Sequence, residues 1–113
     1  MRRGEIWIAN LNPVRGREAG KVRPVIVFQD NSFTNAGAVT VISIPLTTKL
    51  WPGFDPIRIT ISARERLLMK SYAMIEKIRA VDIDRFGEGP LTTLTAVEMA
   101  AVEKSLLAVL GIY

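Results

Sequence analysis

The C-terminal part of the sequence carries its clearest folding signal, because both ends of a helix are marked there. Thr95 and Glu98 have the spacing of a capping box, in which each side chain accepts a hydrogen bond from the other residue's backbone N–H. Leu94 and Met99 stand where the two halves of a hydrophobic staple are expected, and Gly111 is typical of the residue that ends a helix. Apolar residues recur between these ends at helical spacing, namely Met99, Val102, Leu106, Val109 and Leu110.

The sequence before this helix alternates short runs of β-branched residues with turns, which is typical of strands. Pro45 is expected to end the third strand, and Arg58 and Thr60 in the fourth are expected to face water. The five expected strands cover residues 4–9, 25–29, 38–45, 57–61 and 71–78. With the closing helix, they predict a mainly β fold: a small, strongly bent antiparallel sheet or open barrel with a helix packed on it.

Turn-forming residues separate the expected strands. Residues 30–32 and 34–37 contain the Asp, Asn, Ser and Gly that favour turns. Ser62 and Glu65 have capping-box spacing and predict a single helical turn. Residues 82–86 predict another short turn.

The composition excludes several kinds of site. A chain of 113 residues predicts one domain, residues 1–113, with its own core. The sequence has no cysteine and no histidine, so it lacks thiolate ligands, the commonest metal ligand and the commonest general base. Asp82 and Asp84 lack further oxygen ligands at a recognisable spacing, so Asp82 is interpreted as a cap, and no metal or cofactor is expected. No signal peptide or membrane span is visible, which predicts a cytoplasmic protein.

Positive charge is concentrated near the N-terminus. The first 23 residues carry six cations and two carboxylates and therefore hold the whole net charge of +4, while the rest of the chain balances. Such an excess suggests a polyanionic partner such as nucleic acid. A modest positive charge also serves solubility alone, and that alternative stays open here.

A basic loop with two glycines leads into the second strand. Gly16 and Gly20 permit tight turns or the close approach of a ligand, and Pro24 favours an extended Arg23 at the strand entrance. Polar groups on a loop held by a rigid strand are a common arrangement for a functional site. The loop by itself favours the alternative, a solvated hairpin turn with charges on its outer face.

Phosphodiester cleavage is a reaction that these residues could support without histidine. Arginine binds two phosphate oxygens with its planar fork and stays charged, and a Ser or Thr hydroxyl can orient a phosphate oxygen. Glu18 could accept the proton of a ribose 2′-OH, although neighbouring cations would weaken it as a base. The spacing of these residues does not specify the reaction.

Two further segments could contact RNA. Trp51 and Phe54 could stack on unpaired bases while Lys49 holds a phosphate, or the two rings could cap the barrel instead. Lys77 and Arg79 could line the same groove or form a solvated strand end.

Several motifs resemble the MazF/PemK toxins of bacterial toxin–antitoxin pairs. The most specific is Gly20-Lys21-x-Arg23-Pro24-Val25, and Pro45-Leu46-Thr47 at the end of the third strand strengthens it. The remaining motifs follow in the family's order and cover nearly the whole chain, namely residues 3–7, Gly16-x-Glu18, 78–82 and 107–111. The family usually has Gln-Ile-Arg where this chain has Lys77-Ile78-Arg79, so the base contacts there are expected to differ.

The resemblance implies a homodimeric SH3-like barrel that cleaves single-stranded RNA at short sequences without a metal. The implied products carry a 2′,3′-cyclic phosphate and a 5′-hydroxyl. By position, Arg23 would be the catalytic arginine, Thr47 would hold the scissile phosphate, and Glu18 would be a base or an organiser. The residues expected to bind RNA are Arg17, Gly20, Lys21, Thr48, Lys49, Trp51, Phe54, Lys77 and Arg79.

The resemblance also implies an acidic, partly disordered antitoxin as partner, whose carboxylates would compete with phosphates for Arg23 and Lys21. Two other functions stay open: a barrel that lost catalysis and only binds RNA or protein, and a gyrase poison of similar fold. The C-terminal Gly111-Ile112-Tyr113 does not decide for the gyrase poison. A plain oligomerisation module would leave the uneven charge unexplained.

Overall fold

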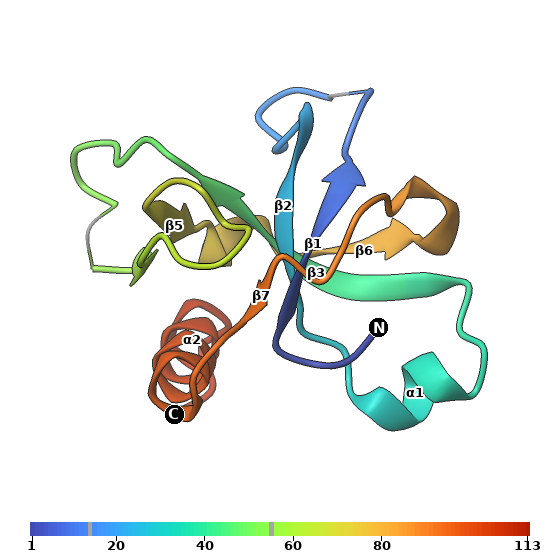
Figure 1. Cartoon of the computed structure of the whole chain (residues 1–113). Coiled ribbons are helices and arrows are strands. Elements are labelled where there is room, and N and C mark those ends of the chain that lie inside the picture. The colour runs from blue at the N-terminus through green and yellow to red at the C-terminus, as the bar shows by residue number, and fades with distance from the viewer. Residues whose placement is uncertain (14, 55) are drawn as a thin grey trace.

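The computed structural model describes residues 1–13, 15–54 and 56–113, and Figure 1 shows its architecture. The strands among these residues are β1 (Glu5–Asn10), β2 (Val22–Val27), β3 (Thr40–Thr47), β4 (Ile59–Ile61), β5 (Ser71–Ala73), β6 (Arg79–Asp82) and β7 (Thr92–Thr93). The helices are α1 (Asn31–Asn35), the 3₁₀ turns η1 (Ile75–Lys77) and η2 (Ile83–Arg85), and α2 (Ala96–Val109). None of the helices described is long and apolar enough to cross a membrane.

The strands form one curled antiparallel sheet organised around β3. Its order is β4-β5-β3-β2-β1-β7, and β6 pairs with the first half of β3. The middle of β3 pairs with β2, and its last two residues pair with β5. The predicted bent antiparallel sheet with a C-terminal helix is confirmed, with seven strands among the described residues in place of the five expected.

The principal core fills the space between this sheet and α2. Fully buried residues from three strands, Ile6, Ile26 and Ile44, belong to the same cluster as Val102 and Leu106 of α2. Burying side chains of this size stabilises the fold by about 1.5–3 kcal/mol each. In Figure 1 the helix lies below the β5 side of the sheet, away from the loop that joins β1 to β2 at the top.

A second, smaller core lies beneath that loop. Leu11 and Ala19 from the loop are buried together with Val25, Met74 and Val81. The loop is therefore anchored by apolar packing at two points, although most of its other described residues are exposed.

Two predicted strand boundaries were wrong because each strand continues through its proline. β2 begins at Val22 and includes Pro24, and β3 continues through Pro45 to Thr47. A proline fits in a strand wherever its missing N–H is not needed in the ladder. The Pro45 carbonyl still accepts a hydrogen bond from Met74 N at 2.8 Å.

The expected strand over residues 71–78 is also wrong. β5 ends at Ala73, η1 follows, and β6 begins at Arg79. Residues 30–37, expected to be turns, include the short helix α1, which is capped by the Asp30 carboxylate. Asp82 caps η2 in the same way, as predicted.

The prediction that Arg58 faces water is wrong. β4 begins only at Ile59, and the Arg58 side chain is 2% exposed. Its Nε and Nη2 donate to the two oxygens of Glu76 at 3.1 and 2.6 Å, and its guanidinium lies 4.7 Å from the centroid of the Phe54 ring. A buried charge needs such a partner, and this one is distant in sequence.

The predicted N-terminus of the C-terminal helix is confirmed. Thr95 accepts a hydrogen bond from Glu98 N, and Glu98 accepts one from Thr95 N. The apolar positions of the helix divide: Val102 and Leu106 are buried and Met99 packs on the core, whereas the predicted positions Val109 and Leu110 are exposed.

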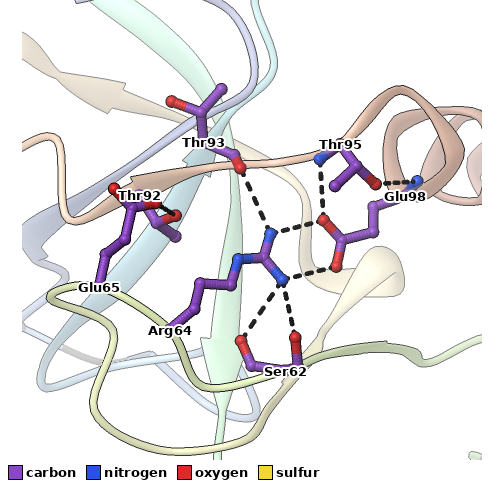
Figure 2. Close-up of polar contacts among 7 residues, drawn as sticks. All are labelled: Ser62, Arg64, Glu65, Thr92, Thr93, Thr95 and Glu98. Atoms are coloured by element: carbon purple, nitrogen blue, oxygen red, sulfur yellow. Dashed lines mark hydrogen bonds and ion pairs between the residues drawn. The ribbon is translucent and has the colours of Figure 1, made fainter.

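Figure 2 shows how the start of α2 is tied to the loop between β4 and β5. Arg64 donates from Nη1 and Nη2 to both carboxylate oxygens of Glu98, at 2.8 and 2.5 Å, and also to Ser62 and to the Thr93 carbonyl. The predicted helical turn at residues 62–65 is absent from this described segment. Arg64 and Leu67 pair there through two backbone hydrogen bonds of 2.9 Å.

Candidate functional site

A cleft of about 730 Å³ lies beside the loop between β1 and β2. Three segments line most of it: residues 18–24, residues 46–49 with Trp51, and residues 66–69 from the β4–β5 connection. The first two segments meet because β2 and β3 pair side by side, with Val25 opposite Pro45. The cleft therefore lies where β3 leaves β2 and begins to pair with β5.

Arg23 crosses the junction of the first two segments. It lies in β2 opposite Ala9 of β1, and its side chain is half-buried. Its Nε donates to the Gly20 carbonyl at 2.6 Å and its Nη1 to the Leu46 carbonyl at 3.2 Å. Among the described residues, Nη2 has no hydrogen-bond acceptor. The guanidinium is thus oriented by two carbonyls while part of its fork remains available to a ligand.

The partial burial of Arg23 changes the pKa of its guanidinium. Burial removes water from the guanidinium and lowers its pKa from the ordinary value. An arginine so placed still carries its positive charge at neutral pH. The two carbonyl partners orient the charge without neutralising it, because a carbonyl oxygen has no net charge.

Thr47 is the last residue of β3 and follows directly after the Leu46 carbonyl that Arg23 holds. Its hydroxyl accepts a hydrogen bond from Lys49 N at 3.2 Å, which fixes the turn that leaves the strand. A hydroxyl that accepts from a backbone N–H still has its own proton to donate to a phosphate oxygen. Arg23 and Thr47 therefore face the cleft from neighbouring strands.

The loop between β1 and β2 presents Glu18, Gly20 and Lys21 to the cleft. Glu18 is exposed, and its backbone N donates to the Arg15 carbonyl at 3.2 Å. Lys21 has a positive φ of 70°, a conformation that an L-residue other than glycine rarely adopts. Strained backbone of this kind occurs most often at functional sites.

Apart from Arg66, the cations of the cleft have no carboxylate partner among the described residues. Among the described residues, the ion pairs formed by side chains involve Arg3, Arg58, Arg64 and Arg66. Of these four arginines, only Arg66 lines the cleft, where it pairs with Glu88. The other cleft cations therefore give this surface a positive potential that attracts a polyanion. They are Lys21, Arg23, Lys49 and Lys77.

A smaller cavity of about 410 Å³ adjoins the cleft. Glu18 and Lys77 line both cavities, and Arg17 and Arg79 line only the smaller one. Phe54 lines neither, because its ring packs on Arg58. The predicted residues that line the larger cleft are Glu18, Gly20, Lys21, Arg23, Thr47, Thr48, Lys49, Trp51 and Lys77.

The structure adds residues to the cleft that the sequence did not indicate. Val22, Leu68 and Met69 are all more than half exposed, with Leu68 the most exposed at 84%. The consecutive apolar residues Leu68 and Met69 between two expected strands were the available signal, but a sequence does not show whether such residues are exposed. Exposed apolar side chains and cations therefore line the same cleft.

Comparison with solved structures gives the fold. MazF from Deinococcus radiodurans superposes with a TM-score of 0.84 at 22% identity, covering 98% of this chain and 96% of that one. An endoribonuclease in complex with its cognate antitoxin, from Mycobacterial species, superposes with a TM-score of 0.74 at 19% identity, covering 100% of this chain and 95% of that one. A MazE–MazF complex from D. radiodurans gives a TM-score of 0.77 at 22% identity, covering 100% of this chain and 97% of that one.

Comparison with protein families gives the kinship. The model of the family described as PemK-like, MazF-like toxin of type II toxin–antitoxin system matches residues 2–110. That match spans the sheet, the cleft and α2. The chain therefore belongs to the PemK-like, MazF-like toxins of type II toxin–antitoxin systems.

Proposed function

We propose that this chain is a sequence-specific, metal-independent endoribonuclease that cleaves single-stranded RNA in the cytoplasm. The observation that carries the proposal is Arg23, a guanidinium oriented by the Gly20 and Leu46 carbonyls beside the Thr47 hydroxyl, in a cleft where Lys21, Lys49 and Lys77 also have no carboxylate partner among the described residues. An oriented but unneutralised arginine is suited to the charge that develops on a phosphate during cleavage. Membership of the toxin family supports the proposal further. The cleft also combines cations, which suit phosphates, with apolar side chains, which suit bases.

In the proposed reaction, the ribose 2′-oxygen attacks the adjacent phosphorus and its proton passes to the Glu18 carboxylate. Arg23 and the Thr47 hydroxyl bind the non-bridging oxygens as negative charge builds on them. The bond from phosphorus to the 5′-oxygen breaks, and that oxygen takes a proton from water in the open cleft. The products are a 2′,3′-cyclic phosphate and a 5′-hydroxyl.

The bases of the RNA would bind along the cleft on either side of this phosphate. Trp51 is 58% exposed and lines the cleft, so its ring is available for stacking. Lys21, Thr48 and Lys49 would contact the backbone on one side. Arg17 and Arg79 would contact it on the other, along the smaller cavity.

The proposal includes two protein partners. A separately encoded acidic antitoxin would occupy the cleft, placing carboxylates where phosphates bind. A second copy of the chain would form a homodimer, and the exposed apolar residues Val39, Ile42 and Ile83 around the β3–β6 edge offer one surface for it. Sedimentation measurements of the free protein would report the dimer.

The test is cleavage of a mixed-sequence single-stranded RNA in EDTA, with mapping of cut positions and end groups. Arg23→Gln is the inactive variant, and Lys104→Gln, which removes a charge from the exposed side of α2, is the matched control. Cuts at a recurring short sequence with cyclic-phosphate ends, lost only in Arg23→Gln, are expected. Intact RNA with the folded, antitoxin-free protein would contradict the proposal and leave a binding-only barrel or a gyrase poison.

A further inference from the structure

The loop between β1 and β2 carries Glu18 and Lys21 to the cleft with little regular secondary structure of its own. Its base is closed by Leu11 N donating to the Lys21 carbonyl at 2.8 Å and by Lys21 N donating to the Asn12 side chain at 3.0 Å. Buried Leu11 and Ala19 anchor it to the smaller core. These contacts hold the two ends of the loop, but Arg17 and Glu18 lie between them.

Three cationic side chains donate to backbone carbonyls of this loop. Arg85 donates to the Asn12 carbonyl of the loop and to the carbonyl of Asn10, the last residue of β1, at 3.2 Å, and Arg23 donates to the Gly20 carbonyl. Lys77 donates from its Nζ to the Arg17 carbonyl, across sixty residues of sequence. The Lys77 bond is thus the contact that reaches the middle of the loop, directly before Glu18.

Lys77 makes this bond from a fixed position. It belongs to η1, whose first residue, Ile75, is fully buried. The next residue, Glu76, takes both hydrogen bonds from the buried Arg58. The half-buried Lys77 therefore extends from a turn held by a core residue and a buried ion pair, and it lines both cavities.

We propose that Lys77 is a positioning residue, which holds the Arg17 carbonyl so that the Glu18 carboxylate stays at the edge of the cleft opposite Arg23. A carbonyl partner leaves the ammonium charge unneutralised, so this clamp does not reduce the positive potential of the cleft. Small displacements of a reacting group lower the rate of the chemical step more than they lower binding. This inference rests on the proposed ribonuclease function only in its kinetic consequences.

The experiment combines backbone hydrogen exchange with cleavage kinetics on Lys77→Met, Lys77→Arg and Lys104→Met. Lys77→Met keeps much of the side-chain length but removes the donor, Lys77→Arg keeps a charged donor, and Lys104→Met matches the charge loss outside both cavities. In Lys77→Met we expect the Glu18 amide, which donates to the Arg15 carbonyl at 3.2 Å, to exchange about tenfold faster and kcat to fall about tenfold, as for one lost charge-assisted hydrogen bond. KM should change less than kcat, Lys77→Arg should restore both readouts, and Lys104→Met should leave both unchanged.

Unchanged exchange of the Glu18 amide in Lys77→Met would overturn the inference, even if RNA binding weakened, because Lys77 would then act only as a surface charge. Exchange of the α2 amides reports whether each variant is folded, and Lys77→Ala is the second donor-free variant if Lys77→Met is not. If the wild-type protein cleaves no RNA, the proposed function fails, whereas the exchange comparison still decides the role of Lys77.

Discussion

Two sets of basic side chains in this molecule have different hydrogen-bond acceptors, carboxylates in one set and backbone carbonyls in the other. At the start of α2, Arg64 meets Glu98 in a two-point ion pair, and behind the cleft Arg58 meets Glu76 in another. At the cleft, Arg23 and Lys77 donate to backbone carbonyls instead. Both kinds of contact fix a side chain in place, but only the first neutralises its charge.

The difference separates contacts that stabilise the fold from contacts that prepare a surface for a ligand. A carboxylate partner stabilises the charged form of an arginine and weakens its field outside the protein. A carbonyl partner orients the same group and leaves its field directed at the cleft. Substitutions in one set should therefore lower stability, and substitutions in the other should lower activity.

Arg23→Gln should have the largest effect, a loss of about 10³-fold in kcat for RNA cleavage, because it removes the cation that faces the phosphate. Stability should change little, by about 1 kcal/mol or less, since the side chain is only half-buried and glutamine can still donate to one carbonyl. Single-turnover cleavage and urea unfolding measure the two effects. A variant that is strongly destabilised but retains its specific activity would instead place Arg23 among the contacts that stabilise the fold.

Glu76→Ala should destabilise the protein by about 3 kcal/mol, because it leaves the Arg58 guanidinium buried without its partner. The double variant Arg58→Met/Glu76→Leu should recover most of that loss, since no charge remains in the interior. Urea unfolding of the three proteins completes the comparison. Equal losses in the single and double variants would show that packing, and not the unpaired charge, sets the cost.

Glu98→Gln should destabilise the protein by about 1 kcal/mol at pH 7, because it ends the ion pair with Arg64 while an amide can retain part of the cap. The hydrogen bond from Arg64 lowers the pKa of Glu98. A lowered folded pKa gives stability that is complete above the unfolded value, about 4.3, and is lost as pH falls through the folded one. The difference between wild type and Glu98→Gln should therefore shrink in acid, and a difference that stayed constant down to pH 2 would contradict this cause.

Trp51→Ala should have the smallest effect on the fold and a moderate one on RNA. Its ring is more than half exposed, so the free energy of unfolding should change by less than about 0.5 kcal/mol. Loss of one stacked base should weaken RNA binding by about 1–3 kcal/mol. Fluorescence anisotropy with a short single-stranded RNA measures this, and a large loss of stability without weaker binding would favour the barrel cap over the stacking role.

The parts of the fold that the sequence predicted correctly were those whose signals come from neighbouring residues in the chain. The capping box of Thr95 and Glu98 and the turn at Asp82 each depend on residues within one turn of chain, and the structure has both. Pro24 and Pro45 led to wrong predictions of where β2 begins and β3 ends. A proline interrupts a strand only if the ladder needs an N–H at its position. That is decided by pairing with strands elsewhere in the chain.

The resemblance to the toxin family, and not the spacing of the residues, indicated Arg23 and Thr47. The pairing of β2 with β3 is what brings their distant segments together. The wall formed by Leu68 and Met69 and the partner of Arg58 could not be predicted in the same way. Each depends on contacts across the sheet that leave no periodic pattern in the residues concerned.

The salt dependence of RNA binding tests the central claim, that the cleft cations remain available to a polyanion. For single strands the slope of log K against log salt is about −0.7 per phosphate neutralised, so the five proposed RNA-binding cations left in Arg23→Gln (Lys21, Lys49 and Lys77 of the cleft, Arg17 and Arg79 of the smaller cavity) predict a slope of about −3.5. Adding Lys49→Met should reduce its magnitude by about 0.7, whereas adding Lys104→Met should leave it unchanged. Equal changes from both substitutions would mean that net charge alone attracts RNA, and the account of an oriented cleft would be wrong.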